Sequence, residues 1–198
     1  MNDEFNIEDY LNSLPDHVNV INIPHKNLNY LPDLSRFKKL ERLYCNNNNL
    51  TSLPVSPKHL KYFSCSYNNL TSLPILPEKL QLLCCSYNNL TSLPVLPENL
   101  KRLYCFNNKL TSLPVLPKDL IWLYNHGNPI YDIINNNNLN IIKKNIIILN
   151  NFRHLYYCLK YRKRFLRMME PVIKKRYHPS YLDDLKEDDD LDEKLNGW

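Results

Sequence analysis

The 198-residue sequence has only 2 glycines and no long apolar run. With so little glycine, its turns must rely on proline, asparagine and serine, and it contains 14 prolines. The apolar run at residues 141–149 is interrupted by Lys143, Lys144 and Asn145. It is shorter than the roughly 20 apolar residues that a membrane-spanning helix needs. We therefore expect no transmembrane segment.

Signals of targeting and of catalysis are also missing from the sequence. The acidic start, from Met1 to Phe5, has no positively charged and apolar leader, which predicts a protein that is not secreted by a signal peptide. We expect it inside a cell, in the cytoplasm of a host or of the producing cell. There is no Gly-rich phosphate loop, no metal-ligand pair at helical spacing and no recognisable pair of catalytic carboxylates. The sequence thus predicts no enzyme, no catalytic or metal-binding residue and no cofactor.

A repeat with a period of 20 residues organises the chain from Leu40 to Ile130. Its copies begin at Leu40, Leu60, Leu80, Leu100 and Leu120. A regular copy reads L-x-x-L-x-C-x-x-N-x-L-T-S-L-P, and the last copy has Asn125 in place of the cysteine. The same apolar columns recur in register, which is the leucine-rich repeat pattern at the short end of its length range.

This pattern predicts an α/β solenoid with a parallel sheet on its concave side. The segment from the first leucine to the cysteine alternates like a half-buried strand, and stacked strands lie about 4.8 Å apart. Paired prolines, as in residues 73–77, predict an extended, polyproline-like convex side. From Leu139 the apolar spacing becomes helical and predicts a C-terminal helical cap. The predicted apolar face of this helix contains Ile148, Phe152, Leu155, Leu159, Leu166 and Met169.

We expect four segments along the chain. Residues 1–17 form an N-terminal cap, residues 18–130 the repeats, residues 131–171 the helical C-terminal cap, and residues 172–198 an acidic, mobile tail. Residues 135–138 read as a polar loop. The first repeat is longer than the others and degenerate, with Lys26 at the asparagine position. Its apolar columns contain Val18, Ile21, Ile23, Leu28 and Leu31.

Two interior columns are chemically unusual. The first contains Cys45, Cys65, Cys85 and Cys105, and the second contains Asn48, Asn68, Asn88, Asn108 and Asn128. Cysteines 20 residues apart are unlike the close pairs of zinc sites, so we expect buried free thiols that fill a tight core column. A buried amide must find partners, and we expect each asparagine to bond the backbone of its own and of the next repeat.

The outward positions of the predicted strands are rich in aromatic and arginine side chains. The candidate partner-binding residues are Arg42, Tyr44, Tyr62, Arg102, Tyr104, Phe106, Trp122 and Tyr124. Tyr, Trp and Arg dominate binding hot spots, which predicts a protein-interaction surface centred on Tyr104, Phe106, Trp122 and Tyr124. The alternative is that these tyrosines suit strands and pair with their neighbours across the sheet.

A basic cluster near the C-terminus supports a second hypothesis. It contains Lys160, Arg162, Lys163, Arg164, Arg167, Lys174, Lys175 and Arg176. Such a cluster could bind a polyanion, either nucleic acid or an anionic membrane. It could equally be a solvated helix face, or be neutralised by the acidic end of the chain. We favour the protein partner because the net charge of +5 is modest and no nucleic-acid-binding signature is present.

The repeat joined to its Leu-Pro-x-Leu-Pro element resembles the short-repeat leucine-rich proteins among secreted bacterial effectors. Effector ligases of that class carry a nucleophilic Cys-x-Asp motif in a large catalytic domain. Here Cys158-Leu159-Lys160 departs from that motif and the tail is too short, so the resemblance implies no ligase activity. A weaker alternative is the substrate receptor of a ubiquitin-ligase assembly. The cysteine column, the bias toward Asn, Ile, Lys and Tyr, and the ending Tyr177-His178-Pro179 resemble leucine-rich repeat proteins encoded by giant DNA viruses.

Overall fold

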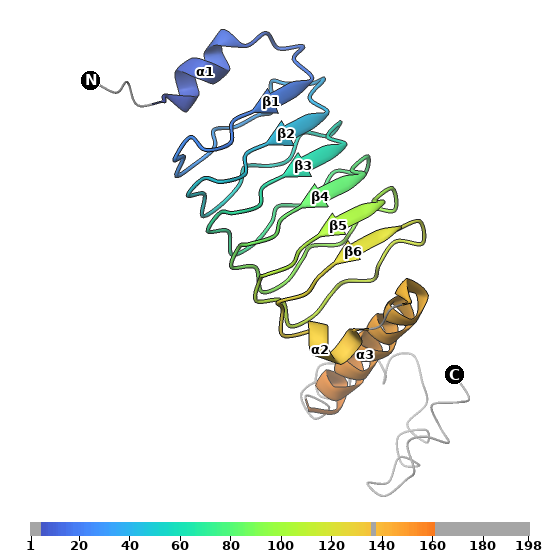
Figure 1. The fold of residues 1–198 in the computed structure, drawn as a ribbon. Coiled ribbons are helices and arrows are strands. Elements are labelled where there is room, and N and C mark those ends of the chain that lie inside the picture. The colour runs from blue at the N-terminus through green and yellow to red at the C-terminus, as the bar shows by residue number, and fades with distance from the viewer. Residues whose placement is uncertain (1–4, 136–137, 161–198) are drawn as a thin grey trace, which may run out of the picture. The chain divides into compact units, whose positions relative to one another are not determined.

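The computed structural model describes residues 5–135 and 138–160 (Figure 1). The chain divides into two compact units, residues 1–150 and 151–198. Most of the described residues belong to the first unit, which contains the repeats. The predicted tail at 172–198, and the part of the predicted helical cap beyond residue 160, lie outside the described residues.

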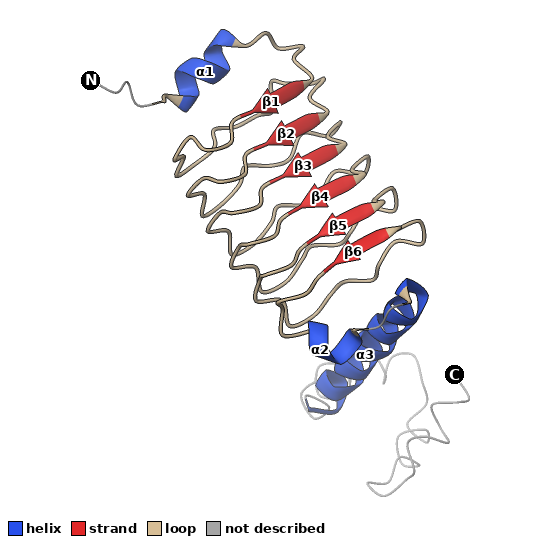
Figure 2. Ribbon diagram, viewed as in Figure 1, coloured by secondary structure: helices blue, strands red, loops and turns tan. Residues whose placement is uncertain are grey.

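The repeats build one parallel sheet of six strands (Figure 2). These strands are β1 (Val20–Asn22), β2 (Arg42–Tyr44), β3 (Tyr62–Ser64), β4 (Leu82–Cys84), β5 (Arg102–Tyr104) and β6 (Trp122–Tyr124). Their order in the sheet is their order in the chain, so every repeat pairs with the repeats directly before and after it in the sequence. The register repeats without a slip, because Leu43, Phe63 and Leu83 lie side by side. The predicted leucine-rich repeat solenoid is confirmed.

Each strand is three residues long and directs its middle side chain into the core. The columns on either side of the strands complete this core, since Leu40, Leu60 and Leu80 are fully buried. The cysteine column is buried as predicted, and the Sγ atoms of Cys45 and Cys85 donate to carbonyl oxygens of the following repeat at 3.5 Å. Within one repeat these columns bury too little surface to fold alone, so stability comes from stacking.

The return path of each repeat contains neither helix nor strand, as the paired prolines predict. Between β3 and β4, for example, Ile75 is exposed while Leu73 and Leu76 are buried. The next strand is reached through a tight turn, which is closed where the Leu80 N–H donates to the Pro77 carbonyl at 3.0 Å. This narrow side lets successive strands stack closely.

The asparagine column ties each repeat to the one before it. The Asn88 side chain donates to the carbonyls of Cys85 in its own repeat, at 3.1 Å, and of Cys65 in the preceding repeat, at 3.0 Å. Its Oδ1 accepts from the backbone N–H of Leu70, also in the preceding repeat, at 3.0 Å. The prediction that the amide reaches the next repeat is therefore wrong in direction. The turn that follows each strand directs the asparagine side chain toward the preceding repeat.

The N-terminal end begins with helix α1 (Ile7–Ser13). The Asn6 side chain caps this helix by accepting from the backbone N–H groups of Glu8 at 2.9 Å and Asp9 at 3.3 Å. Ile7 and Leu11 are buried in the same core as the repeats. The register predicted for the first repeat is correct, because Ile21 pairs with Leu43 and the Lys26 N–H donates to Asn48 at 3.0 Å.

Two helices follow the last strand, α2 (Tyr131–Ile134) and α3 (Leu139–Lys160). The predicted C-terminal helix is confirmed, whereas α2 was not predicted. The apolar face assigned to α3 is wrong where its side chains are described, because Ile142 and Ile146 are buried while Ile148 and Phe152 are exposed. Residues 139–149 are apolar on nearly every side, so spacing alone could not select the face. Among the described helices, none is long and apolar enough to cross a bilayer.

Contacts with the last repeats fix the face of α3. The Asn150 side chain donates to the Leu113 carbonyl at 3.1 Å, and Lys143 Nζ donates to the Lys118 carbonyl at 2.6 Å. These bonds turn Ile142 and Ile146 toward the core. The predicted face residues Leu155, Leu159, Leu166 and Met169 have side chains outside the described residues.

The asparagine column gives a prediction for stability. Replacing Asn88→Ala leaves a buried N–H and two buried carbonyls without the amide, which costs about 2–4 kcal/mol in the free energy of unfolding. Chemical denaturation measures this loss. The matched control is Asn69→Ala, an exposed asparagine for which we expect a change within about 0.5 kcal/mol. Equal losses in the two variants would contradict the role of the column.

Candidate functional site

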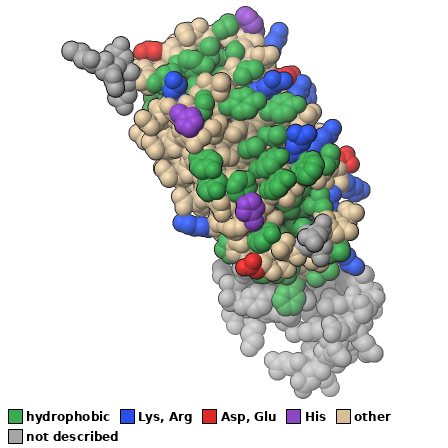
Figure 3. Space-filling model, in the orientation of Figure 1, with side chains coloured by type: hydrophobic (Ala, Val, Ile, Leu, Met, Phe, Trp, Pro, Cys, Tyr) green, Lys and Arg blue, Asp and Glu red, His purple; other side chains and the backbone are tan. Residues whose placement is uncertain are grey.

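The concave face consists of the outward side chains at the first and third positions of strands β2 to β6, together with the residue that follows the buried cysteine position. The first positions are Arg42, Tyr62, Leu82, Arg102 and Trp122, and the third are Tyr44, Ser64, Cys84, Tyr104 and Tyr124. These residues flank a buried middle residue, so core packing fixes their backbone. The core does not constrain which side chain each outward position carries. Figure 3 shows hydrophobic side chains gathered over the middle of this face and Lys and Arg side chains along one flank.

Three aromatic rings at the end of the concave face form the Trp122 cluster, made of Tyr104, Trp122 and Tyr124. The rings of Tyr104 and Tyr124 are parallel, with centroids 5.0 Å apart and planes 4° from each other. Trp122 lies along the same strand, 6.4 Å from Tyr124 and within 8° of parallel. Although stacked, Trp122 is 49% exposed and Tyr124 is 40% exposed. The cluster is therefore ordered and still open to solvent.

Of the other predicted residues in the strands, Arg42, Tyr44 and Tyr62 lie apart from this cluster, whereas Arg102 lies next to it. The Arg42 guanidinium stacks on the Tyr62 ring at 5.2 Å, a cation–π contact between neighbouring strands. Tyr44 is half-buried beside Ser64, and Arg102 is exposed beside Trp122. Leu82 and Cys84 of β4 lie between the Arg42–Tyr62 pair and the Trp122 cluster. The structure thus separates the predicted site into two groups.

A second row of aromatic side chains lies just beyond the strands. This aromatic row contains Tyr67, Tyr87, Phe106, His126 and Tyr131, and each ring contacts the next. Tyr67 stacks on Tyr87 at 4.2 Å, and Phe106 stacks on His126 at 4.6 Å. Of this row, only Phe106 is among the predicted partner-binding residues. Tyr67 and Tyr87 replace asparagine in the repeat, and this substitution was the signal that could have identified them.

The two tyrosines occupy a backbone position that favours other residues. His25, Asn47, Tyr67, Tyr87, Asn107 and Gly127 share this position in successive repeats, and all have positive φ, between 51° and 66°. Asparagine and glycine tolerate this left-handed conformation, whereas a bulky side chain is strained in it. A Cβ on Gly127 would lie 2.0 Å from Asn107 Oδ1, so the Asn107 side chain would have to rotate away to admit one. Strained residues of this kind concentrate at functional sites.

The cysteines offer little reactivity. Burial raises the pKa of Cys45 and of Cys105 to about 12, and raises the pKa values of Cys65 and Cys85 well above the usual value. Cys84 lies on the concave face, where partial burial raises its pKa to about 11. Among the described residues, no group of three or more His, Cys, Asp or Glu side chains is placed to hold a metal ion.

The structure says nothing about the predicted polyanion-binding cluster. The Lys160 side chain lies outside the described residues, as do all of Arg162, Lys163, Arg164, Arg167, Lys174, Lys175 and Arg176. This alternative therefore stays a prediction.

The repeat geometry defines the class of protein: this chain is a leucine-rich repeat solenoid. A scan against protein-family models gives no match, and a search of curated proteins gives none either. Solved structures do match. YopM from Yersinia enterocolitica WA-314 is 38% identical over 59% of this chain and 25% of its own, with a TM-score of 0.56. A Shigella effector leucine-rich repeat domain is 32% identical over 62% of this chain and 54% of its own, also with a TM-score of 0.56.

These comparisons confirm the resemblance to the leucine-rich repeat domains of bacterial effectors. The match spans about a quarter of the length of YopM and about half of the Shigella domain. What the whole proteins do therefore reaches this chain only as a proposal. The predicted resemblance to proteins of giant DNA viruses is not tested by these matches and stays a prediction.

The positive φ of the tyrosine positions can be tested without a partner. Tyr87→Gly and Tyr87→Ala both remove the ring, but only glycine is free of strain at φ 53°. We expect the glycine variant to be more stable than the alanine variant by about 0.5–1 kcal/mol in chemical denaturation. The same pair at Tyr62, in strand β3, should show the reverse order by about 0.5–1 kcal/mol. If the glycine and alanine variants had the same order of stability at both positions, there would be no backbone strain specific to Tyr87.

Thiol labelling tests the burial of the cysteines. In a Cys158→Ser chain at pH 8, the five remaining thiols should react slowly with a disulfide reagent, because their raised pKa values keep them protonated. As the pH rises toward 11, the rate at Cys84 should increase about tenfold per pH unit, since the thiolate forms in that range. Cys84→Ser should remove this phase. Rapid labelling of Cys45 or Cys105 at pH 8 in the folded protein would contradict the assignment.

Proposed function

We propose that this protein is an interaction module that binds a protein partner through the concave face. The observation that supports this most directly is the Trp122 cluster, in which parallel rings are held on the sheet and yet remain 49% and 40% exposed at Trp122 and Tyr124. Leucine-rich repeat solenoids are generally scaffolds for protein interaction, and the similar solved structures come from effector proteins. No catalytic role is proposed for any described residue.

The energetics of the cluster favour binding. An exposed aromatic ring removes a large area from water when a partner covers it, and it loses few side-chain rotations in doing so. Stacking between Tyr104 and Tyr124 restricts these rotations before the partner arrives. The strands beneath carry core residues such as Leu103, which is fully buried, so the backbone is fixed too. The concave face is in this sense pre-organised.

The competing interpretation is that the rings only stabilise the sheet by pairing across strands. Cross-strand pairing accounts for the stacking of Tyr104 on Tyr124 but gives no reason for Trp122 to be half exposed. The backbone strain at Tyr67 and Tyr87 also favours a binding role, because asparagine would adopt the same positive φ with less conformational strain. Both features are expected of side chains that serve a partner rather than the fold.

The test is affinity capture of proteins from cell lysate on the immobilised full chain, with nuclease present throughout. We expect Tyr104→Ala with Trp122→Ala to lose the specific partner, because hot-spot aromatics contribute about 2 kcal/mol or more each to binding. This corresponds to at least about a thirtyfold weaker affinity per residue, measured afterwards with the purified partner. Circular dichroism and thermal unfolding confirm that the variant is folded.

The matched control is Ile75→Ala with Val95→Ala, which removes exposed apolar side chains from the return path instead. We expect this control to retain the partner. The proposal is wrong if both double variants capture the same proteins as the wild type. Raising the salt concentration separates the remaining alternative, since binding through phosphates weakens steeply with salt while binding through aromatic hot spots does not.

A further inference from the structure

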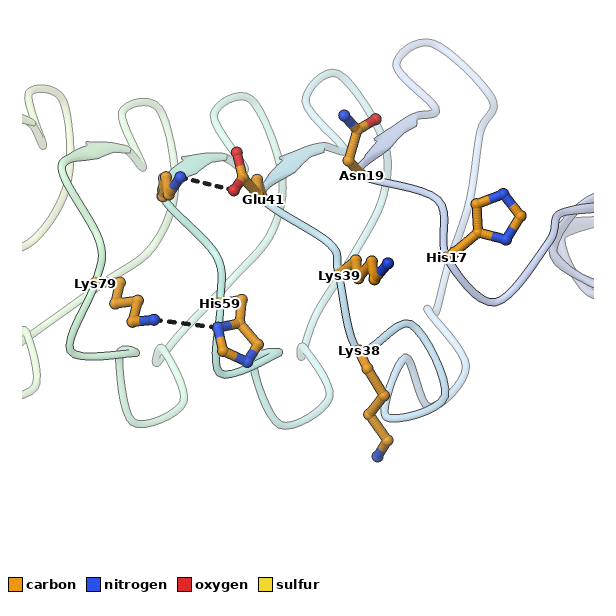
Figure 4. Close-up of a pocket in the computed structure, with 8 residues that line it drawn as sticks. His17, Asn19, Lys38, Lys39, Glu41, His59 and Lys79 are labelled. Carbon is orange, nitrogen blue, oxygen red and sulfur yellow. Dashed lines mark hydrogen bonds and ion pairs between the residues drawn. The ribbon is translucent and has the colours of Figure 1, made fainter.

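A surface hollow of about 470 Å³ lies beside the first three strands, away from the Trp122 cluster. Two layers of residues line it. Asn19, Glu41 and Lys61 directly precede strands β1, β2 and β3, and Lys39, His59 and Lys79 come from the turns of successive repeats. Figure 4 shows Lys39 and His17 at one end of this basic hollow and the His59–Lys79 pair at the other.

The charges in the basic hollow are unbalanced. Its one carboxylate, Glu41, forms an ion pair with Lys61 at 2.6 Å, and this contact lowers the pKa of Glu41. Within residues 5–135 and 138–160, neither Lys39 nor Lys79 forms an ion pair. Lys79 Nζ lies 3.4 Å from the ring nitrogen Nδ1 of His59, which is uncharged when it accepts a hydrogen bond. The ammonium groups of Lys39 and Lys79 thus have no ion-pair partner among the described residues.

The fold does not demand these basic residues. The turns that supply them have the sequences Lys38–Lys39, Lys58–His59 and Glu78–Lys79, whereas the two later turns have Glu98–Asn99 and Lys118–Asp119. All five turns have the same position in the repeat and lead into the same kind of strand. Since acidic and neutral residues serve equally well there, the lysines at the hollow call for another explanation.

We infer that the basic hollow binds the phosphate group of a phosphorylated serine or threonine in a polypeptide. A phosphomonoester carries close to two negative charges and three acceptor oxygens, which matches ammonium groups that each donate up to three hydrogen bonds. Lys39 and Lys79 lie two repeats apart, about 10 Å along the array at about 4.8 Å per repeat, a gap that two long and flexible lysine side chains can close around a single phosphate placed between them.

Nucleic acid fits the hollow less well. A nucleic acid strand engages many phosphates along an extended basic stripe. Here the turn position that is basic in the first three turns, as Lys39, His59 and Lys79, is Asn99 and Asp119 in the later ones, and Glu98 lies beside Asn99. The basic hollow shares no residue with the Trp122 cluster, so phosphopeptide binding at the hollow and partner binding at the concave face can be tested independently.

The experiment measures fluorescence anisotropy of labelled peptides with the full chain at 150 mM salt. The probes are a degenerate nine-residue peptide library with a central phosphoserine, the same library with serine, and a mixed-sequence single-stranded oligonucleotide. We expect the phosphoserine library to bind at least about tenfold more tightly than either other probe. Equal binding of the two libraries, or tighter binding of the oligonucleotide, would overturn the inference.

Two double variants locate the binding. Lys39→Gln with Lys79→Gln should weaken phosphopeptide binding about tenfold or more, while Lys109→Gln with Lys118→Gln, which removes the same charge elsewhere, should leave it within about twofold. Tyr104→Ala with Trp122→Ala should also leave it unchanged, which distinguishes this site from the concave face. Equal losses in the two lysine variants would show a general charge effect and overturn the assignment to the basic hollow.

Discussion

The side-chain amide of the asparagine column is the interaction on which the solenoid depends. Each repeat has a sharp turn after its strand, where backbone groups are buried and cannot reach water. The amide supplies both donor and acceptor there, as Asn68 does when it donates to the Cys45 carbonyl and accepts from the Leu50 N–H. Every bond of this kind between repeats reaches the preceding repeat. Because no repeat precedes the first one, an asparagine is not needed there, and Lys26 can occupy its position.

The interior of this protein was predictable from its sequence, because a repeat imposes the same environment on every copy. The leucine and cysteine columns, the parallel register and even the degenerate first repeat follow from matching positions such as Ile21 and Leu43. Features that are not periodic were harder. The face of α3 depends on contacts with Leu113 and Lys118, which no spacing within the helix could indicate.

The outward residues were predictable in position but not in arrangement. Alternation placed Tyr104, Trp122 and Tyr124 on the concave face, yet only the structure shows their stacking and the gap at Leu82 and Cys84. The aromatic row was largely missed, because Tyr67 and Tyr87 stand at a turn position defined by φ rather than by hydrophobicity. The basic hollow was missed for a similar reason, since its lysines come from separate repeats that the sequence keeps apart.

The backward direction of the asparagine bonds also bears on how such an array can change in length. A repeat inserted between two existing repeats brings the asparagine amide that the preceding repeat requires. The asparagine of the repeat that follows then bonds the inserted repeat in the same way. Duplication or deletion of a whole internal unit, such as residues 80–99, therefore leaves every turn with its partners. The two ends have no such freedom, because they meet α1 and α2 rather than another repeat. Variation in repeat number should arise in the middle of the array, with the terminal segments kept unchanged.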